Sequence, residues 1–274
     1  MSDTIPRTAF VHIPKCGGQS FEAVLRGAYY ETGYSQFFPD EIDVEPDPNT
    51  YKESDFATLT ADELTHHHHG VWGHISFPQY AAIFTKPHYL AWNFVTVLRN
   101  PVEFYISLYQ YVRGYEEHPQ HEDAKRQTLR EFLDEQGPNN FQCAFATGQL
   151  TFEGARHVLA QRYTAYCALD DISEFASVYS DFLDGALRRD ISQLNASNSH
   201  QLFTTLNADD LRWLIAQVRE DYLLVEWVRR TWRRHMMSAL RARNHEIDVD
   251  RHPEFLGLAN DPQRSSPIIA ARRA

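Results

Sequence analysis

Short apolar runs alternate along this chain with segments whose apolar residues recur at helical spacing. Residues 8–13, 93–98 and 164–169 are short, apolar and rich in β-branched or aromatic side chains, which predicts buried strands. Residues 70–77 form a further apolar run that we expect to pass through or beside the same sheet. Because helical segments follow these runs, the pattern favours an α/β fold with a parallel, doubly wound sheet flanked by helices.

Apolar stripes and capping residues predict the helices. An apolar face that includes Phe21 and Leu25 predicts a helix beginning near Ser20. A second helix is expected to begin at Pro101, because Asn100 can cap it and proline suits the first helical position. Further helices are predicted at residues 124–135, 151–161, 171–187 and from 207 towards 241.

Three stretches lack a sustained period. Residues 33–62 are rich in Asp, Glu, Pro and Tyr, which suits a surface excursion or an acceptor-binding loop. Residues 188–200 are polar and loop-like, and the chain from 251 onward is expected to be a loosely packed tail. The sequence therefore predicts a single domain over residues 1–250 and a C-terminal tail over residues 251–274.

Composition narrows the class of protein. The chain has 274 residues, 43% of them hydrophobic, which permits a substantial core. Its net charge of −11 argues against a general nucleic-acid or anionic-membrane binder, although a local basic pocket is compatible with it. No run reaches the length of a membrane span, and residues 1–7 lack a signal-peptide pattern, so a cytosolic location is expected.

The cysteine and histidine residues do not predict a metal site. Cys16, Cys143 and Cys167 are odd in number and widely separated, which indicates free thiols rather than a disulfide framework or a zinc site. Cys16 is an alternative candidate nucleophile, but no adjacent base supports that role. The four consecutive histidines at 66–69 would point in different directions in any regular element, so an exposed loop is expected there.

A loop near the N-terminus has the features of an anion site. The first strand stops at Pro14, and Gly17 and Gly18 then lead into a helix that begins near Ser20, whose open N-terminus offers backbone N–H groups to an anion. Lys15 precedes the glycines, whereas the Walker-type loop places its lysine after them. A standard ATP- or GTP-hydrolysing site is therefore not matched, and an ordinary strand-to-helix turn with a solvated lysine is the alternative.

A second anion site is predicted where the strand at 93–98 ends. Arg99 follows this strand directly, and Ser107 lies off the apolar stripe of the next helix, so the two can converge. Taken alone, Arg99 could simply pair with Glu103, and Ser107 could face solvent. Together with the N-terminal loop, they indicate a ligand with two separated phosphate-like groups.

Both motifs resemble those of a known enzyme family. Residues 12–20 resemble the 5′-phosphosulfate loop, and residues 98–109 the 3′-phosphate element, of sulfotransferases that use 3′-phosphoadenosine 5′-phosphosulfate (PAPS). The resemblance is closest to the carbohydrate branch that includes the heparan sulfate 2-O-sulfotransferases, and it implies a P-loop-like fold. Weaker agreement is found at residues 140–142 with Gly148, 168–172 with Phe175, 195–197 and 221–222.

The resemblance implies a role for each matching residue. Lys15 would neutralise charge on the phosphate leaving group, and Arg99 with Ser107 would clamp the 3′-phosphate. The 5′ side would be held by Cys16, Gly17, Gly18, Gln19 and Ser20. The family usually has Thr at position 16 and often at position 19, so Cys16 and Gln19 would contribute backbone N–H groups. PAPS would be the donor and adenosine 3′,5′-bisphosphate (PAP) the product, and the scheme requires no metal.

The same resemblance points to a candidate base. The Gly73-His74 segment is similar to the one that supplies the catalytic histidine in the 2-O branch, and imidazole titrates close enough to neutrality to accept a proton. That branch often has a second histidine two positions earlier, where this chain has Trp72. A structural histidine bonded to the backbone is the alternative role for His74.

These observations predict a cytosolic, bacterial sulfotransferase that moves a sulfuryl group from PAPS to a hydroxyl of a carbohydrate or glycan. Two alternatives remain open: a P-loop nucleotide-dependent kinase, and a non-catalytic module that binds phosphoadenosine or a sulfated ligand. The kinase lacks support because no Mg²⁺-binding carboxylate motif is legible. The sequence leaves the acceptor and the oligomeric state open.

Overall fold

A six-stranded parallel sheet forms the centre of the molecule. The computed structural model describes residues 6–29, 33–38, 50–52, 60–84, 91–136, 140–183 and 207–242. The strand order is β3-β2-β4-β1-β5-β6, and every neighbouring pair is parallel. The strands are β1 (Thr8–Val11), β2 (Gly33–Phe38), β3 (Thr50–Lys52), β4 (Gly70–Gly73), β5 (Asn93–Leu98) and β6 (Tyr163–Ala168).

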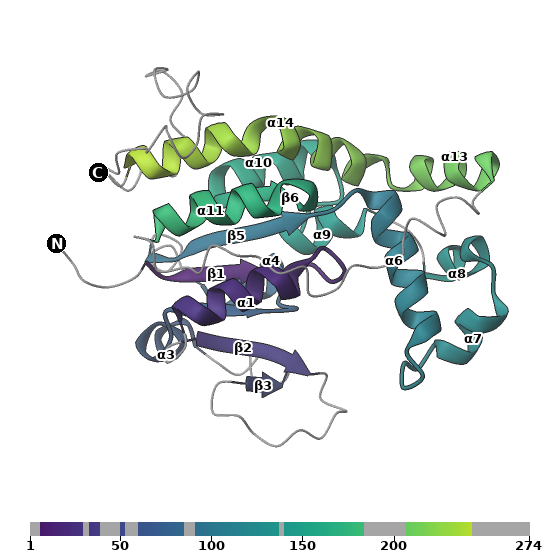
Figure 1. Ribbon diagram of the computed structural model, residues 1–274, viewed down its shortest axis with the longest axis horizontal. Coiled ribbons are helices and arrows are strands. Elements are labelled where there is room, and N and C mark those ends of the chain that lie inside the picture. The colour runs from purple at the N-terminus through teal and green to yellow at the C-terminus, as the bar shows by residue number, and fades with distance from the viewer. Residues whose placement is uncertain are drawn as a thin grey trace.

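Helices cover both faces of this sheet, as Figure 1 shows. In that view α1 (Gly18–Ala28) and α11 (Ile172–Phe182) lie in front of the sheet, and α10 (Phe152–Arg162) lies behind it. The long helix α14 (Arg219–Ala242) contacts β6. The remaining helical elements are α3 (Ala61–His67), α4 (Phe77–Ile83), α6 (Pro101–Gly114), α7 (His121–Arg126), α8 (Leu129–Gln136), α9 (Phe141–Thr147), η1 (Leu169–Asp171) and α13 (Ala208–Gln217). The predicted doubly wound α/β fold is therefore confirmed.

Apolar and aromatic side chains fill the space between these layers. On the α1 side, the Phe21 ring lies 5.5 Å from Phe175 and 5.9 Å from Tyr179 of α11. Elsewhere in the core, Phe77 of α4 lies 5.5 Å from Phe94 of β5. All residues of β1, β4, β5 and β6 are buried, which is the pattern of strands covered on both faces.

The chain order creates a switch point beside β1. The chain leaves β1 to build β2, β3 and β4 on one side, and then crosses to build β5 and β6 on the other side. Ligands of open parallel sheets bind outside the carboxyl ends of the strands at such a switch point. The segments that follow β1, β4 and β5 therefore meet at the edge where a site is expected.

Two predictions on the β4 side of the sheet are wrong for the residues that the structure describes there. Residues 33–62, expected to be an aperiodic excursion, contribute β2, which pairs with β4, and β3 at the sheet edge. These strands are too short to show a period, but the aromatic residues of β2 favour extended structure. The histidine run at 66–69 is not an exposed loop, since α3 extends to His67 and His68 is 9% exposed. Among the described side chains, no group of three or more potential ligands could hold a metal ion.

Two predicted helices are interrupted. The segment 124–135 is split because Thr128 starts a new helix: its hydroxyl accepts from the Glu131 N–H at 3.3 Å, and the Glu131 carboxylate accepts from the Thr128 N–H at 2.8 Å. The stretch from 207 is divided into α13 and α14 at Val218. The loop predicted at 188–200 and the tail predicted at 251–274 lie outside the described residues. No helix in the described ranges is long and apolar enough to cross a membrane.

Candidate anion-binding site

The loop after β1 forms a tight turn into α1. Lys15 and Gly17 both have left-handed backbone conformations, with φ of 61° and 73°. Gly17 is the N-cap of α1, and the first turn of this 11-residue helix carries no acidic side chain. A non-glycine residue at positive φ is uncommon and is concentrated at functional sites. The turn therefore presents the open N-terminus of α1 as a ready place for an anion.

Position 18 requires a glycine because the His12 ring leaves no room for a side chain there. A Cβ atom at Gly18 would lie 1.8 Å from His12 Cδ2 and 2.0 Å from His12 Nε2. The His12 ring has little room to move, because it is 3% exposed and stacks on Phe10 at 5.5 Å. The second glycine of the loop is thus fixed by close packing against a buried ring.

Gly18→Ala is expected to destabilise the fold by about 1–3 kcal/mol, because the added methyl group forces His12 out of a packed position. The same displacement should distort the first turn of α1 and weaken anion binding. Gly27→Ala is the matched control: it lies on the same helix and its added Cβ would meet nothing within 4 Å. Thermal unfolding of both variants tests this, and equal melting temperatures would contradict it.

A buried histidine–glutamate pair lies against the loop after β1. His12 Nδ1 lies 2.7 Å from Glu22 Oε1, and the two side chains are 4% and 2% exposed. The His12 ring also meets His74 edge-on, with centroids 4.7 Å apart. Sequence reasoning missed this pair, because the spacing between the end of a strand and the second turn of a helix carries no recognisable signal. It connects the loop after β1 to the segment after β4.

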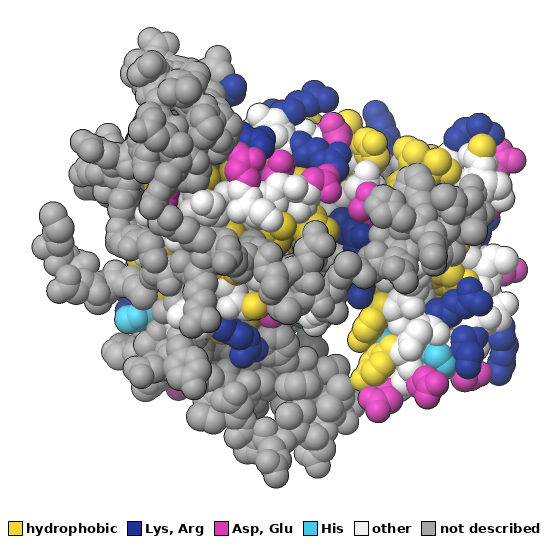
Figure 2. Space-filling view, viewed as in Figure 1, with side chains coloured by type: hydrophobic (Ala, Val, Ile, Leu, Met, Phe, Trp, Pro, Cys, Tyr) yellow, Lys and Arg dark blue, Asp and Glu magenta, His cyan; other side chains and the backbone are white. Residues whose placement is uncertain are grey.

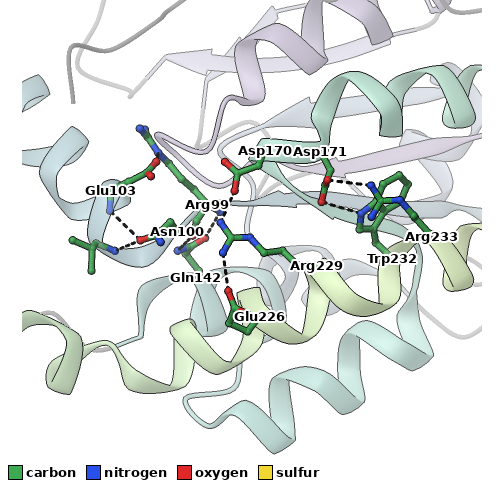
Figure 3. A network of polar contacts seen from close by, with 11 residues as sticks. Arg99, Asn100, Glu103, Gln142, Asp170, Asp171, Glu226, Arg229, Trp232 and Arg233 are labelled. Carbon is green, nitrogen blue, oxygen red and sulfur yellow. Dashed lines mark hydrogen bonds and ion pairs between the residues drawn. The ribbon is translucent and has the colours of Figure 1, made fainter. Parts of the chain in front are cut away.

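Arg99 connects the loop to the end of β5, and Figure 3 shows its surroundings. Its Nη1 donates to the Lys15 carbonyl oxygen at 3.1 Å, and its Nε lies 3.4 Å from Glu103 Oε2. The ion pair with Glu103 that was the alternative role of Arg99 is therefore present. Because the same guanidinium also holds the carbonyl of Lys15, Arg99 brings the two predicted motifs together.

Gln142 of α9 holds the backbone of Arg99. Its Oε1 accepts from the Arg99 N–H at 2.9 Å, and its Nε2 donates to the Arg99 carbonyl at 2.8 Å. The N-terminus of α9 is in turn held by Asp221 of α14, whose carboxylate accepts from the Gln142 and Cys143 N–H groups at 3.0 and 2.7 Å. Burial raises the pKa of Asp221 to about 6. These contacts give the weakly matching residues 140–142 and 221 a structural role.

Asp221→Asn is expected to lower stability by about 1–3 kcal/mol, because an amide can accept only one of the two backbone N–H bonds and leaves the other buried donor unsatisfied. The N-terminus of α9 should loosen, and with it the grip of Gln142 on Arg99. Hydrogen exchange at the Gln142 and Cys143 amides measures this directly. Unchanged protection at both amides would show that Asp221 does not hold the N-terminus of α9.

The turn after β6, which contains η1, packs against the loop after β1. A Cβ atom at Gly17 would lie 2.3 Å from Leu169 Cδ1, so η1 packs directly on the loop. Arg229 of α14 pairs with Asp170, and Trp232 Nε1 donates to Asp171 at 3.0 Å (Figure 3). The long C-terminal helix thereby anchors the turn that covers Gly17.

The other predicted binding residues differ in how far they are open to a ligand. Ser107 is 2% exposed, on α6 about two turns beyond Arg99. Cys16 is 1% exposed, its thiol donates to Gln142 Oε1 at 3.5 Å, and burial raises its pKa. Gln19 is exposed and Ser20 half-buried at the start of α1. Cys16 is therefore a thiol near neutral pH, and all three cysteines are free, as predicted.

His74 directly follows β4, and its ring lies beside that of His12. It retains solvent-exposed surface, but the packing around its ring, followed by the electrostatic effect of the His12 and Lys15 side chains, lowers its pKa to about 3. The imidazole is therefore neutral at physiological pH. Trp72, which stands where a second histidine was considered, is 3% exposed in the core of β4 and has no place at the site.

Lys15 is the second cation of the site, beside Arg99. Its side chain is half-buried, and burial followed by the charge of Arg99 lowers its pKa. Its Nζ lies 4.3 Å from the centroid of the Tyr111 ring of α6. The site therefore combines a row of backbone donors with two cations and a neutral imidazole, which is suited to group transfer from an anionic donor.

The fold and the site define an α/β protein of the P-loop-like class whose lysine precedes the glycines of its loop. Comparison with protein families agrees with this description: the model of the Sulfotransferase family matches residues 5–182 of the 274. The chain belongs to the sulfotransferase family, and membership supports sulfuryl transfer to a hydroxylated acceptor. A comparison with curated proteins gave no match.

Proposed function

We propose that the protein transfers a sulfuryl group from PAPS to a hydroxyl group of a carbohydrate-like acceptor. The observation that carries this proposal is the bond from Arg99 Nη1 to the Lys15 carbonyl, because it links the two segments that are predicted to hold the two phosphate groups. The left-handed turn at Gly17 and the close packing at Gly18 support an anion at the start of α1. These residues fit the two phosphate-bearing ends of PAPS, which when bound supplies the activated sulfuryl group.

Lys15 places a positive charge beside the phosphate oxygen that receives electrons as its bond to sulfur breaks. Arg99 and Ser107 hold the 3′-phosphate, while backbone N–H groups of residues 16–20 hold the 5′ side. Because Cys16 is buried against Gln142, its contribution is the backbone N–H rather than the thiol. Such a site works by positioning and by charge stabilisation, as phosphoryl-transfer sites do.

His74 is the base in this proposal. It accepts the proton of the acceptor hydroxyl while the new oxygen–sulfur bond forms. The low pKa of the imidazole, about 3, keeps it unprotonated before the reaction, but it also makes the free group a weak base. A polyanionic donor bound beside His74 favours the imidazolium and raises this pKa, so the base gains strength when the donor is in place.

The proposals on the acceptor, the domain bounds, the location and the source of the protein are supported by the sequence alone. A carbohydrate or glycan acceptor follows from the resemblance to the heparan sulfate 2-O branch. We also propose a domain over residues 1–250 with a tail at 251–274, a cytosolic location and a bacterial source.

Calorimetry tests the donor assignment without an acceptor. The protein should bind PAP more tightly than ATP with Mg²⁺, and Arg99→Ala should weaken PAP binding. Tighter binding of ATP with Mg²⁺ would instead favour the kinase. Tight PAP binding without transfer to any hydroxylated acceptor would favour a non-catalytic binding module.

A further inference from the structure

Tyr111 is an exposed aromatic residue in direct contact with the cation of the site. It belongs to α6, is 43% exposed, and lies under Lys15 Nζ at 4.3 Å from its ring centroid. Its ring also stacks on Tyr115, with centroids 5.5 Å apart, and meets His118 edge-on at 6.1 Å. Figure 2 shows hydrophobic side chains beside a hollow in the surface where α6 lies. Tyr111 thus combines partial exposure to solvent with a direct contact to the ammonium group of Lys15.

The surroundings of Lys15 disfavour the charged ammonium form of its side chain. Burial, followed by the nearby guanidinium of Arg99, opposes the charged form and lowers the pKa of Lys15. The carboxylate of Glu103 is engaged with Arg99 at 3.4 Å. Within the described ranges, no carboxylate lies within ion-pair distance of Lys15 Nζ, and the ammonium group contacts the ring of Tyr111 instead.

The face of an aromatic ring attracts a cation through its quadrupole, and a distance of 4.3 Å from the centroid is well inside the range of this interaction. Unlike a carboxylate, the ring offsets the cost of the ammonium without competing as a strong anion. A phosphate can therefore draw the ammonium away from the ring, since a charge-assisted bond to phosphate is the stronger contact.

We propose that Tyr111 is a positioning residue for Lys15, and that its ring keeps the lysine charged and holds the ammonium group beside α6 until a phosphate group replaces the ring as its partner. The role of Lys15 in transfer rests on the proposed function. The contact with Tyr111 and its effect on the lysine do not, and they can be tested separately.

The direct test is the titration of Lys15 in the free protein. The chain has only four lysines, Lys15, Lys52, Lys86 and Lys125, so reductive methylation with a ¹³C label gives few signals to assign. In Tyr111→Leu the pKa of Lys15 should fall by about 0.4–1.5 units, the size of a cation–π contact expressed as a titration shift. Tyr111→Phe keeps the ring and should restore the original value.

Two controls separate this effect from a general disturbance. Tyr115→Leu alters the neighbouring ring and leaves Tyr111 in place, so the Lys15 titration should not move. Lys125, whose side chain is 50% exposed beside Glu122, is an internal reference in every variant. An unchanged Lys15 pKa in folded Tyr111→Leu, or equal shifts in the Leu and Phe variants, would overturn the proposal. A variant that fails to fold leaves the Leu–Phe comparison to be made with Tyr111→Met.

Kinetics supply the second readout. Because transfer needs charged Lys15, the basic limb of the pH profile of kcat/KM for PAPS, which reports the free enzyme, should move to lower pH in Tyr111→Leu, by the same amount as the titration, and remain in place in Tyr111→Phe. A titration shift without any transfer activity in the wild type would leave Tyr111 as the partner of Lys15 and reject the proposed function. A shifted titration with an unmoved basic limb would overturn the link between Tyr111 and transfer.

Discussion

Lys15→Ala is expected to reduce sulfuryl transfer by about 10³-fold, close to the limit of detection. The substitution removes the charge that stabilises the leaving phosphate, and contacts of this kind, made where charge develops, typically contribute 10²–10³ in rate. The loop itself should survive, because Arg99 holds the carbonyl of Lys15 rather than its side chain. Single-turnover rates with saturating PAPS measure the loss.

Lys125→Ala is the matched control for this experiment. Lys125 lies on α7, its side chain is 50% exposed, and its pair with Glu122 spans 3.4 Å on the surface. Pairs of this kind contribute little to stability, so turnover should remain near the wild-type value. If Lys15→Ala retained transfer within about tenfold of the wild type, Lys15 would not be the residue that stabilises the leaving group.

His74→Ala is expected to lower turnover by about 10²–10⁴-fold, the usual contribution of a general base. Binding of PAP should be retained, because the predicted phosphate contacts come from residues 15–20, Arg99 and Ser107. His12 and Glu22 lie beneath His74 and remain paired without it, so the fold should be little affected.

His157→Ala serves as the control, since His157 is exposed on α10 behind the sheet. It should leave both turnover and PAP binding unchanged. A different outcome for His74, with transfer at the full rate or with PAP binding lost in parallel, would show that this residue is not the base.

The sequence predicts the parts of the fold that local patterns determine. The strand at 93–98 is found with the same bounds as β5, and Asn100 caps α6 as expected, its Oδ1 accepting from the Val102 N–H at 3.0 Å. The apolar run determines the bounds of the strand, and the capping residue determines where the helix begins. Both signals are contained within a few residues.

The contacts that assemble the site are different, because they join residues far apart in the chain. Gln142 meets Arg99 across 43 positions, and Asp221 meets Gln142 across 79. Each is a polar side chain whose partner is a backbone group, and backbone partners have no sequence signature. The contact of Lys15 with Tyr111 depends likewise on the packing of α6 beside the loop. Sequence thus predicts candidate residues for the site, and the structure shows how these residues are held.

Transfer of radiolabelled sulfate from PAPS to a set of hydroxylated carbohydrates tests the central proposal most directly. The wild-type protein should move label to at least one carbohydrate and release PAP in equal amount, and Lys15→Ala should do both about 10³-fold more slowly. Absence of labelled product from the wild type across the set, or equal transfer by the wild type and Lys15→Ala, would contradict the account.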